Sequence, residues 1–254
     1  MQKFKPGYLR YLLRRKIILS FILVLGFINI SFAQLRESLN LPNHDDKPYY
    51  FGIVLGYNVS NYNISHSPYF LQQDSISSIE SVNSGRIHLG IVANLQLSKR
   101  WDIRFYPLNL IFSQKKFQYD LKYPDPDDGA IRKTQRVESI VMSWPLQVRL
   151  KSDRIRNFKV YTLAGLKFDY DLASNAGATN ADNLLKVKKS DFGYELGIGF
   201  QFFYQYFILS PEIKISNGLG NVLVTDHTLK YSNVIDRLNS RMIMFSLHFE
   251  GGGL

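Results

Sequence analysis

The sequence contains no cysteine, which excludes a disulfide framework and any thiol chemistry. Beyond residue 30 it also lacks a long apolar segment. The apolar run near the N-terminus, Ile17–Ile30, has 14 residues, and a helix needs about 20 to cross a bilayer. We therefore expect no helical membrane anchor.

Acidic residues are absent from the first 33 positions, although 21 occur in the whole chain. Six basic residues in that part supply more than half of the formal net charge of +10, which leaves only +4 for the remainder. No basic run interleaved with aromatic residues follows, as a nucleic-acid groove would require. The charge therefore predicts no nucleic-acid partner.

Catalytic and cofactor-binding motifs are missing as well. GxSxG, HExxH and a glycine-rich phosphate loop do not occur, and His88 and His248 have no serine and acid at a specific spacing. The run "NHDD", Asn43–Asp46, offers oxygen and nitrogen ligands, but such a run is typical of a solvated linker. We expect no enzyme, no cofactor and no metal. A lipid-modifying barrel enzyme stays open as an alternative.

The first 33 residues have the three parts of a secretory signal peptide. A basic segment ends in "RRK", the apolar run follows, and Ser31 and Ala33 form a small-x-small cleavage site before Gln34. We predict that residues 1–33 are removed and that the mature protein starts at Gln34. Residues 34–48 would then form a short N-terminal segment.

The rest of the chain consists of eight runs that are aromatic-rich or alternate large apolar with polar residues, a pattern typical of β-strands. The runs are about 10–15 residues long, against about 5–6 in globular proteins and about 9–11 for tilted membrane strands. They cover Tyr49–Asn58, Arg86–Leu97, Trp101–Phe112, Val137–Leu150, Phe158–Leu172, Asp191–Phe203, Phe207–Ser216 and Arg241–Glu250. In the third run the alternation slips near Pro107, which predicts a β-bulge.

The connections between these runs alternate strictly between long and short. The first, residues 59–85, is long and polar, and the second is only "SKR". Outer-membrane barrels have this pattern, with long external loops and short periplasmic turns. We predict an all-β fold: an eight-stranded antiparallel transmembrane β-barrel of the outer membrane over residues 49–250, followed by a tail over residues 251–254. A secreted soluble β protein is the alternative.

The stretch "DFGYELGIGFQFF", Asp191–Phe203, indicates which face of the wall meets lipid. Its large apolar residues share one face, and its charged residues and glycines share the other. The interior of an eight-stranded barrel is just wide enough for side chains to fill. We therefore place Glu195 and the glycines inside and Leu196 outside, in lipid.

The same phasing points ten charged or histidine residues into the lumen. They are Arg86, His88, Arg104, Arg149, Lys167, Asp169, Glu195, Glu212, Lys214 and His248. An ion path is one interpretation. Because buried charges must be paired, we favour a structural plug made of Arg104, Lys167, Asp169, Glu195, Glu212 and Lys214. A plugged eight-stranded barrel is not a wide pore.

Two stretches carry a resemblance to a known family. "LPNHDDKPYYFGIVLGYN", Leu41–Asn58, and "FILSPEIKISNGLGN", Phe207–Asn221, resemble the first and the penultimate strand of the PorT family, known in gliding bacteria as SprT. These are outer-membrane proteins of Bacteroidetes associated with the type IX secretion system. The resemblance extends over about residues 40–249 and implies a barrel needed to secrete proteins that carry a C-terminal signal domain.

The resemblance implies no catalytic residues, and it suggests partners. We expect an accessory secretion component that contacts outer-membrane lipid, other secretion-system subunits and secreted cargo. Its N-terminal segment would lie in the periplasm, where we expect Leu41, Pro42, Asp45 and Asp46 to contact a partner. A simple linker would have a similar sequence. A structural or adhesive barrel that acts through its external loops is the alternative from another class.

Overall fold

The computed structural model describes residues 39–71, 76–124, 129–174, 186–224 and 234–251. The predicted signal peptide, the start at Gln34 and the last three residues of the predicted tail lie outside them. The described residues form two short 3-10 helices, η2 (Pro42–Asp46) and η3 (Pro68–Leu71), and nine strands. The strands are β1 (Tyr49–His66), β2 (Ile76–Val82), β3 (Ser84–Gln96), β4 (Trp101–Leu121), β5 (Arg132–Lys151), β6 (Phe158–Asp171), β7 (Ser190–Phe203), β8 (Ile208–Gly218) and β9 (Ile235–Gly251).

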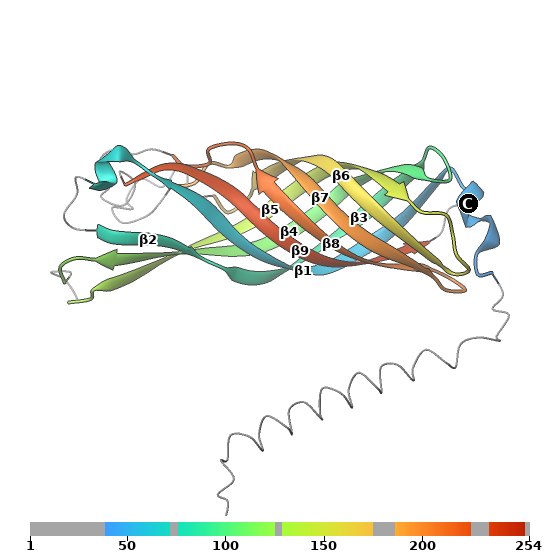
Figure 1. Ribbon diagram of the computed structural model, residues 1–254, viewed down its shortest axis with the longest axis horizontal. Helices are drawn as coiled ribbons and strands as arrows, with labels where there is room; N and C mark the ends of the chain where they lie inside the picture. The colour runs from blue at the N-terminus through green and yellow to red at the C-terminus, as the bar shows by residue number, and fades with distance from the viewer. Residues whose placement is uncertain (1–38, 72–75, 125–128, 175–185, 225–233, 252–254) are drawn as a thin grey trace, which may run out of the picture. The chain divides into compact units, whose positions relative to one another are not determined.

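The strands pair antiparallel and close into a ring (Figure 1). β1 pairs with both β3 and β9, and the pairing of β4 with β5 completes the circle. β2 and β3, which Asn83 separates, pair with successive parts of β4 and share one position in the ring. The predicted all-β antiparallel barrel is confirmed. Closing the sheet gives each position in the ring a neighbour on both sides, so no strand edge is left open to a hydrocarbon environment.

The two ends of the barrel differ. At the short-turn end, residues 97–100, 152–157 and 204–207 connect the strands, and η2 lies there with the end of β9 (Figure 1). At the long-loop end, the connections of β4 with β5, β6 with β7 and β8 with β9 are longer. Within the described residues, no helix has the length and apolar character to cross a membrane.

The wall turns large apolar residues outward and polar residues inward over most of its length. On β7, Leu196 and Ile198 are 52% and 53% exposed, whereas Glu195 and Gln201 are 1% and 2% exposed. The orientation predicted for this stretch is confirmed. An apolar exterior around a charged interior is stable in lipid and not in water.

Exposed aromatic residues gather at the short-turn end of the wall. They are Tyr49, Phe51, Trp101, Phe202, Tyr204, Tyr206 and Phe207. Tyr204 and Phe207 stack with their ring centres 5.1 Å apart across the last short turn. Amphipathic rings at this level form the interfacial girdle of membrane barrels, so the girdle marks one boundary of the lipid-facing band.

Near the long-loop end the outward residues become polar and the buried inward residues become apolar. On β4 the outward residues change from Leu110 and Phe112 to Lys116, and the buried inward residues change from Arg104 to Phe117. Inward apolar residues of several strands form one cluster here with residues of the long connections: Tyr62, Ile76, Ile79, Phe117, Tyr119, Leu121, Val187, Val222, Leu223, Val234, Ile235 and Leu238. The wall therefore continues past the lipid into water, around a small core of its own.

This extension makes the strands longer than the sequence predicts. β1 continues to His66 and β4 to Leu121, and β5 begins at Arg132 rather than Val137. The prediction of a polar loop over residues 59–85 is wrong in large part, because both ends of that segment are strand. The reversal of the two faces disrupts the pattern that identifies the lipid-crossing part of each strand.

The predicted β-bulge near Pro107 is confirmed. Between Phe105 and Leu110, β4 contains one more residue than its neighbour β5, and it shows the same shift against β3 between Phe105 and Leu108. Proline has no backbone N–H to donate, so it fits a position where the pairing is interrupted. The bulge keeps Arg104 on one side of it and Asn109 on the other directed inward.

Candidate functional site

The lumen holds a network of buried ion pairs centred on Arg104. Its Nη1 donates to Glu212 Oε2 at 2.7 Å, and its Nη2 donates to Glu250. Its Nε donates to Asn94 at 2.9 Å, and Tyr161 donates to the same oxygen of Glu212 at 2.7 Å. The three charged side chains are 0% exposed. β4 and β8 stand on opposite sides of the ring, so the bond from Arg104 to Glu212 crosses the whole lumen.

A second arginine lies next to this centre, nearer the short-turn end. Arg149 donates from Nε and Nη2 to the two oxygens of Asp102, at 2.7 and 2.6 Å. This two-pronged geometry makes arginine–carboxylate pairs strong. Lys151 lies 3.1 Å from the same carboxylate, and Arg149 also lies 3.4 Å from Glu250. Glu250 therefore joins the two arginine layers.

Toward the long-loop end the pairs become simpler. Lys214 Nζ lies 3.1 Å from Glu195, and Lys167 pairs with Asp169 on the same strand. The six residues of the predicted plug are all buried in the lumen and form three ion pairs. The pairs are Arg104 with Glu212, Lys214 with Glu195, and Lys167 with Asp169.

The inward phase of the predicted runs already includes three further lumen charges, and one more position on the fourth run adds another. They are Asp102, Lys151, Lys159 and Glu250. Asp102 precedes the bulge on β4, where the alternation is hard to read, and Glu250 follows His248 on the inward face of β9. Together with the six predicted residues, these four form the ion-pair network of the lumen.

One predicted lumen residue lies elsewhere. The prediction that Arg86 points into the lumen is wrong: its side chain is 45% exposed and lies 3.8 Å from Glu138 on the outer face of β5. Pairing with β4 is interrupted between Val82 and His88. Asn58 donates its side-chain amide to the carbonyl of Phe112 at 3.0 Å and satisfies that part of β4. The interruption lets Arg86 leave the inward face.

The N-terminal segment completes the charge balance of the lumen. Among the described residues outside the long-loop extension, the buried lumen cations are Arg104, Arg149, Lys151, Lys159, Lys167 and Lys214, and the buried anions are Asp102, Asp169, Glu195, Glu212 and Glu250. Asp45 of η2 supplies the sixth carboxylate, because its Oδ1 lies 2.7 Å from Lys159 Nζ. An unpaired buried ammonium is strongly unfavourable, so η2 is part of the folded barrel, at its mouth.

Several further contacts hold this segment across the short-turn end. Arg154 donates to the carbonyls of Asn40 and Leu41, and its guanidinium lies 3.8 Å from the ring centre of Phe203. His44 packs edge-on against the rings of Tyr50 and Phe203, with ring centres 4.6 and 5.9 Å away. Burial lowers the pKa of His44 from 6.5 to about 4, so the imidazole is neutral at pH 7. The segment closes this end of the lumen.

The four residues proposed for a partner contact lie in two different environments. Leu41 is half-buried in a left-handed backbone conformation, and its carbonyl accepts from Arg154. Asp45 faces Lys159, as described. Pro42 and Asp46 are exposed. Only these last two present their side chains to the surroundings.

Inward glycines make room for the large polar side chains. A Cβ at Gly199 would lie 2.4 Å from the ring of Tyr161, and one at Gly56 would lie 2.3 Å from the imidazole of His88. Contacts this short do not occur between real atoms. The glycines on the polar face are therefore needed because large side chains of the neighbouring strands, Tyr161 on β6 and His88 on β3, lie across them.

The histidines of the lumen lie in closed surroundings. His88 Nε2 lies 3.0 Å from Ser246 Oγ, but within the described part of the chain its Nδ1 has no hydrogen-bond partner, so the acid of a catalytic triad is missing there. His248 contacts Tyr106 at 3.0 Å and the carbonyl of Ser210. Among the described residues, no three His, Asp or Glu side chains are arranged to hold a metal ion.

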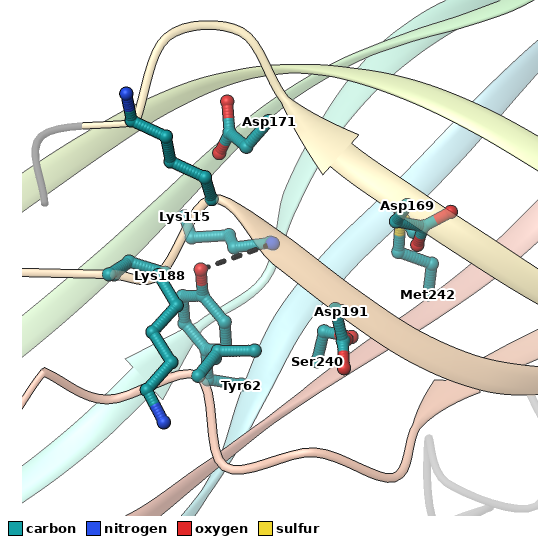
Figure 2. Close-up of a pocket in the computed structure, with 11 residues that line it drawn as sticks. Tyr62, Lys115, Asp169, Asp171, Lys188, Asp191, Ser240 and Met242 are labelled. Carbon is teal, nitrogen blue, oxygen red and sulfur yellow. Dashed lines mark hydrogen bonds between the residues drawn. The ribbon is translucent and has the colours of Figure 1, made fainter.

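A pocket lies near the long-loop end (Figure 2). Lys115, which is 4% exposed, donates to the hydroxyl of Tyr62 at 3.2 Å, and Asp171 and Asp191 line the same space. Met242, which packs in a small apolar cluster with Ile111, Val141 and Met244, also lines the pocket. Asp169 also lines the pocket, so the pocket adjoins the Lys167–Asp169 ion pair of the lumen.

A family model described as the outer membrane protein β-barrel domain matches residues 32–224. Nothing among curated proteins matches the chain.

Solved outer-membrane barrels are similar in fold. OprG of Pseudomonas aeruginosa is 12% identical, with 82% of this chain and 98% of that chain covered and a TM-score of 0.45. Neisserial surface protein A is 9% identical, with 78% and 96% covered and a TM-score of 0.40. Ail, the attachment invasion locus protein of Yersinia pestis, is 10% identical, with 80% and 98% covered and a TM-score of 0.37.

Proposed function

Since the chain belongs to the outer membrane protein β-barrel family, we propose that it is an accessory component of a type IX secretion system and not itself the conduit. The closed lumen is the observation that carries the second half of this proposal. Arg104, Arg149 and their carboxylate partners fill the interior, and η2 closes one end. A folded or unfolded cargo chain has no route through such a barrel.

The resemblance of Leu41–Asn58 and Phe207–Asn221 to PorT sequences supports the first half. In this proposal the short-turn end faces the periplasm and the long loops face outward. Orientation follows from the usual arrangement of bacterial barrels, in which short turns are periplasmic. The protein is not an enzyme in this proposal, because both lumen histidines are buried away from any substrate.

The partner contact is centred on the exposed part of η2. The barrel holds this helix in a fixed position through Arg154, Lys159 and the packing of His44. A fixed helix offers Pro42 and Asp46 to another subunit without the entropic cost of ordering a free linker. Leu41 and Asp45 support the contact from inside by holding the helix.

A secretion assay in cells tests the proposal. Deleting the gene should leave cargo with its signal domain uncleaved in the periplasm, and re-expression should restore export. Changing Pro42 to Ser together with Asp46 to Asn should reduce export while the barrel still reaches the outer membrane. Changing the exposed Asn43 to Ser, in the same helix, is the matched control and should export normally. Normal export in the deletion strain would reject the secretion role.

One observation favours a second candidate. The long-loop end continues past the lipid as an extension with its own apolar core, which is a rigid support for loops that bind a surface. An adhesive barrel would show normal secretion after deletion and reduced attachment of cells. Altered lipid A with normal secretion would instead indicate a lipid-modifying enzyme.

A further inference from the structure

We propose that the outer face of β4 and β5, just beyond the lipid-facing band, binds the phosphate groups of an outer-leaflet glycolipid through Lys116 and Arg136. The two residues are directly opposite in the strand register. Like charges at such a position destabilise a sheet, because their Cβ atoms are only about 4.5–5.5 Å apart. An anion bound between them removes the repulsion.

The neighbouring rows on this face carry acidic residues, among them Glu80 of β2, which stands opposite Gln118. Toward the membrane, Glu138 lies 3.8 Å from Arg86 and accepts from Gln114 at 3.2 Å. Farther from the membrane, Arg132 lies 2.7 Å from Asp120. Within the described residues, neither Lys116 nor Arg136 has a hydrogen bond or ion pair through its side chain. The two cations between these rows are therefore free to bind an external anion.

The position of the pair identifies the anion as a lipid phosphate. The last apolar row on these strands is Phe112 opposite Ile140, and Lys116 follows four residues later. Four residues of a strand tilted by about 45° rise about 10 Å. The headgroup layer is about 5–8 Å thick on each side of the hydrocarbon, and long basic side chains bend back toward it. The site is thus continuous with the lipid-facing surface.

The chemistry of the pair fits a phosphorylated headgroup. An arginine guanidinium binds two phosphate oxygens at once, and lysine adds a compact charge. The outer leaflet follows from the orientation proposed above, on which this inference rests. If cells export cargo normally without the protein but the barrel still binds the glycolipid, the proposed secretion role is rejected and the lipid site stands. The two proposals can therefore be tested separately.

Native mass spectrometry of the purified, refolded barrel tests the site. The probes are bisphosphorylated lipid A and the same glycolipid after removal of both phosphates. We expect the wild type to retain the phosphorylated form at least about fivefold better, since two exposed ion pairs contribute about 1 kcal/mol or more together. The double variant Lys116→Gln and Arg136→Gln should lose this preference.

The matched control removes two charges from the short-turn end. Lys99 and Arg156 are exposed and lie in two of the short turns. The double variant Lys99→Gln and Arg156→Gln should keep the wild-type preference. Equal retention by wild type and the Lys116/Arg136 variant, equal retention of the dephosphorylated glycolipid, or preference for a soluble polyanion such as heparin over lipid A would each overturn the inference.

Thermal unfolding tests the inference independently of the lipid retention measured by native mass spectrometry. Arg136→Glu replaces the like-charged pair with an opposite one. In an uncharged detergent this variant should unfold at the same or a higher temperature than the wild type. Adding lipid A should raise the unfolding temperature of the wild type and not of the variant. A wild type that lipid A does not stabilise would contradict a phosphate site here.

Discussion

Arg104 on β4 and Glu212 on β8 meet at 2.7 Å in the middle of the barrel, although their strands stand on opposite sides of the ring. Both side chains are 0% exposed. The guanidinium of Arg104 also binds Glu250 on β9. One cation therefore holds two buried carboxylates and links β4 to β8 and β9, whose partner residues are 108 and 146 positions away in sequence.

Replacing Arg104 by Met should destabilise the barrel strongly. Glu212 and Glu250 would stay buried without this partner, which costs about 3–5 kcal/mol when a buried pair is broken from one side. Urea unfolding in lipid vesicles measures the change. Arg100→Met is the control, because Arg100 and Asp153 form an exposed pair, 62% and 73% exposed, worth about 0–1 kcal/mol. Equal effects of the two substitutions would contradict a central role for Arg104.

The orientation of β7 can be tested at adjacent residues. Leu196→Arg would place a charge in the lipid-facing band and should cost about 2–4 kcal/mol near the midplane. A fluorophore on a single cysteine at position 196 should be quenched from the lipid phase, whereas one at position 195 should not. Quenching at position 195 alone would mean that Glu195 faces lipid and Leu196 faces the lumen.

The fit of Tyr161 against Gly199 predicts a position-specific effect of alanine. Gly199→Ala would place a Cβ 2.4 Å from the tyrosine ring, and overpacking of this kind costs about 1–3 kcal/mol. At Gly251 a Cβ would meet its nearest atom at 3.4 Å, so Gly251→Ala should have little effect. Chemical unfolding of both variants decides the point, and equal stabilities would show that the lumen is not tightly filled there.

The barrel should not conduct as a wide pore. In planar bilayers the purified wild type should give no large stable conductance step, because paired charges fill the lumen and η2 closes the short-turn end. A stable step comparable with that of a general porin would contradict the closed lumen and with it the proposed accessory role.

The closure by η2 should weaken in mild acid. The folded segment favours neutral His44, whose pKa falls to about 4 on burial. Its stabilisation is fully present above pH 6.5, decreases as the pH falls from 6.5 to about 4, and does not change further below that. Protease cleavage within residues 40–47 should therefore increase between pH 7 and pH 4.5. His44→Phe should remove most of this increase; an unchanged increase would assign it to another group.

The sequence determined which face of the wall meets lipid, because a period of two leaves each strand only two arrangements. It also determined the short connections and the bulge at Pro107, because both depend on residues that are neighbours in the sequence. It also identified Glu195, Glu212 and Lys214 as inward-facing, since each lies among apolar residues of opposite phase. The secretion role stays a prediction based on resemblance.

Only the tertiary structure decided which charges meet. Arg104 reaches Glu212 because closure of the ring and its register bring β4 opposite β8, and neither is visible in one strand. The same holds for Asp45 and Lys159, which are joined when η2 folds into the mouth of the barrel. Closure also decided where the wall leaves the lipid, because beyond that level Phe117 is buried against other strands, and an inward apolar residue reads in sequence like a lipid-facing one.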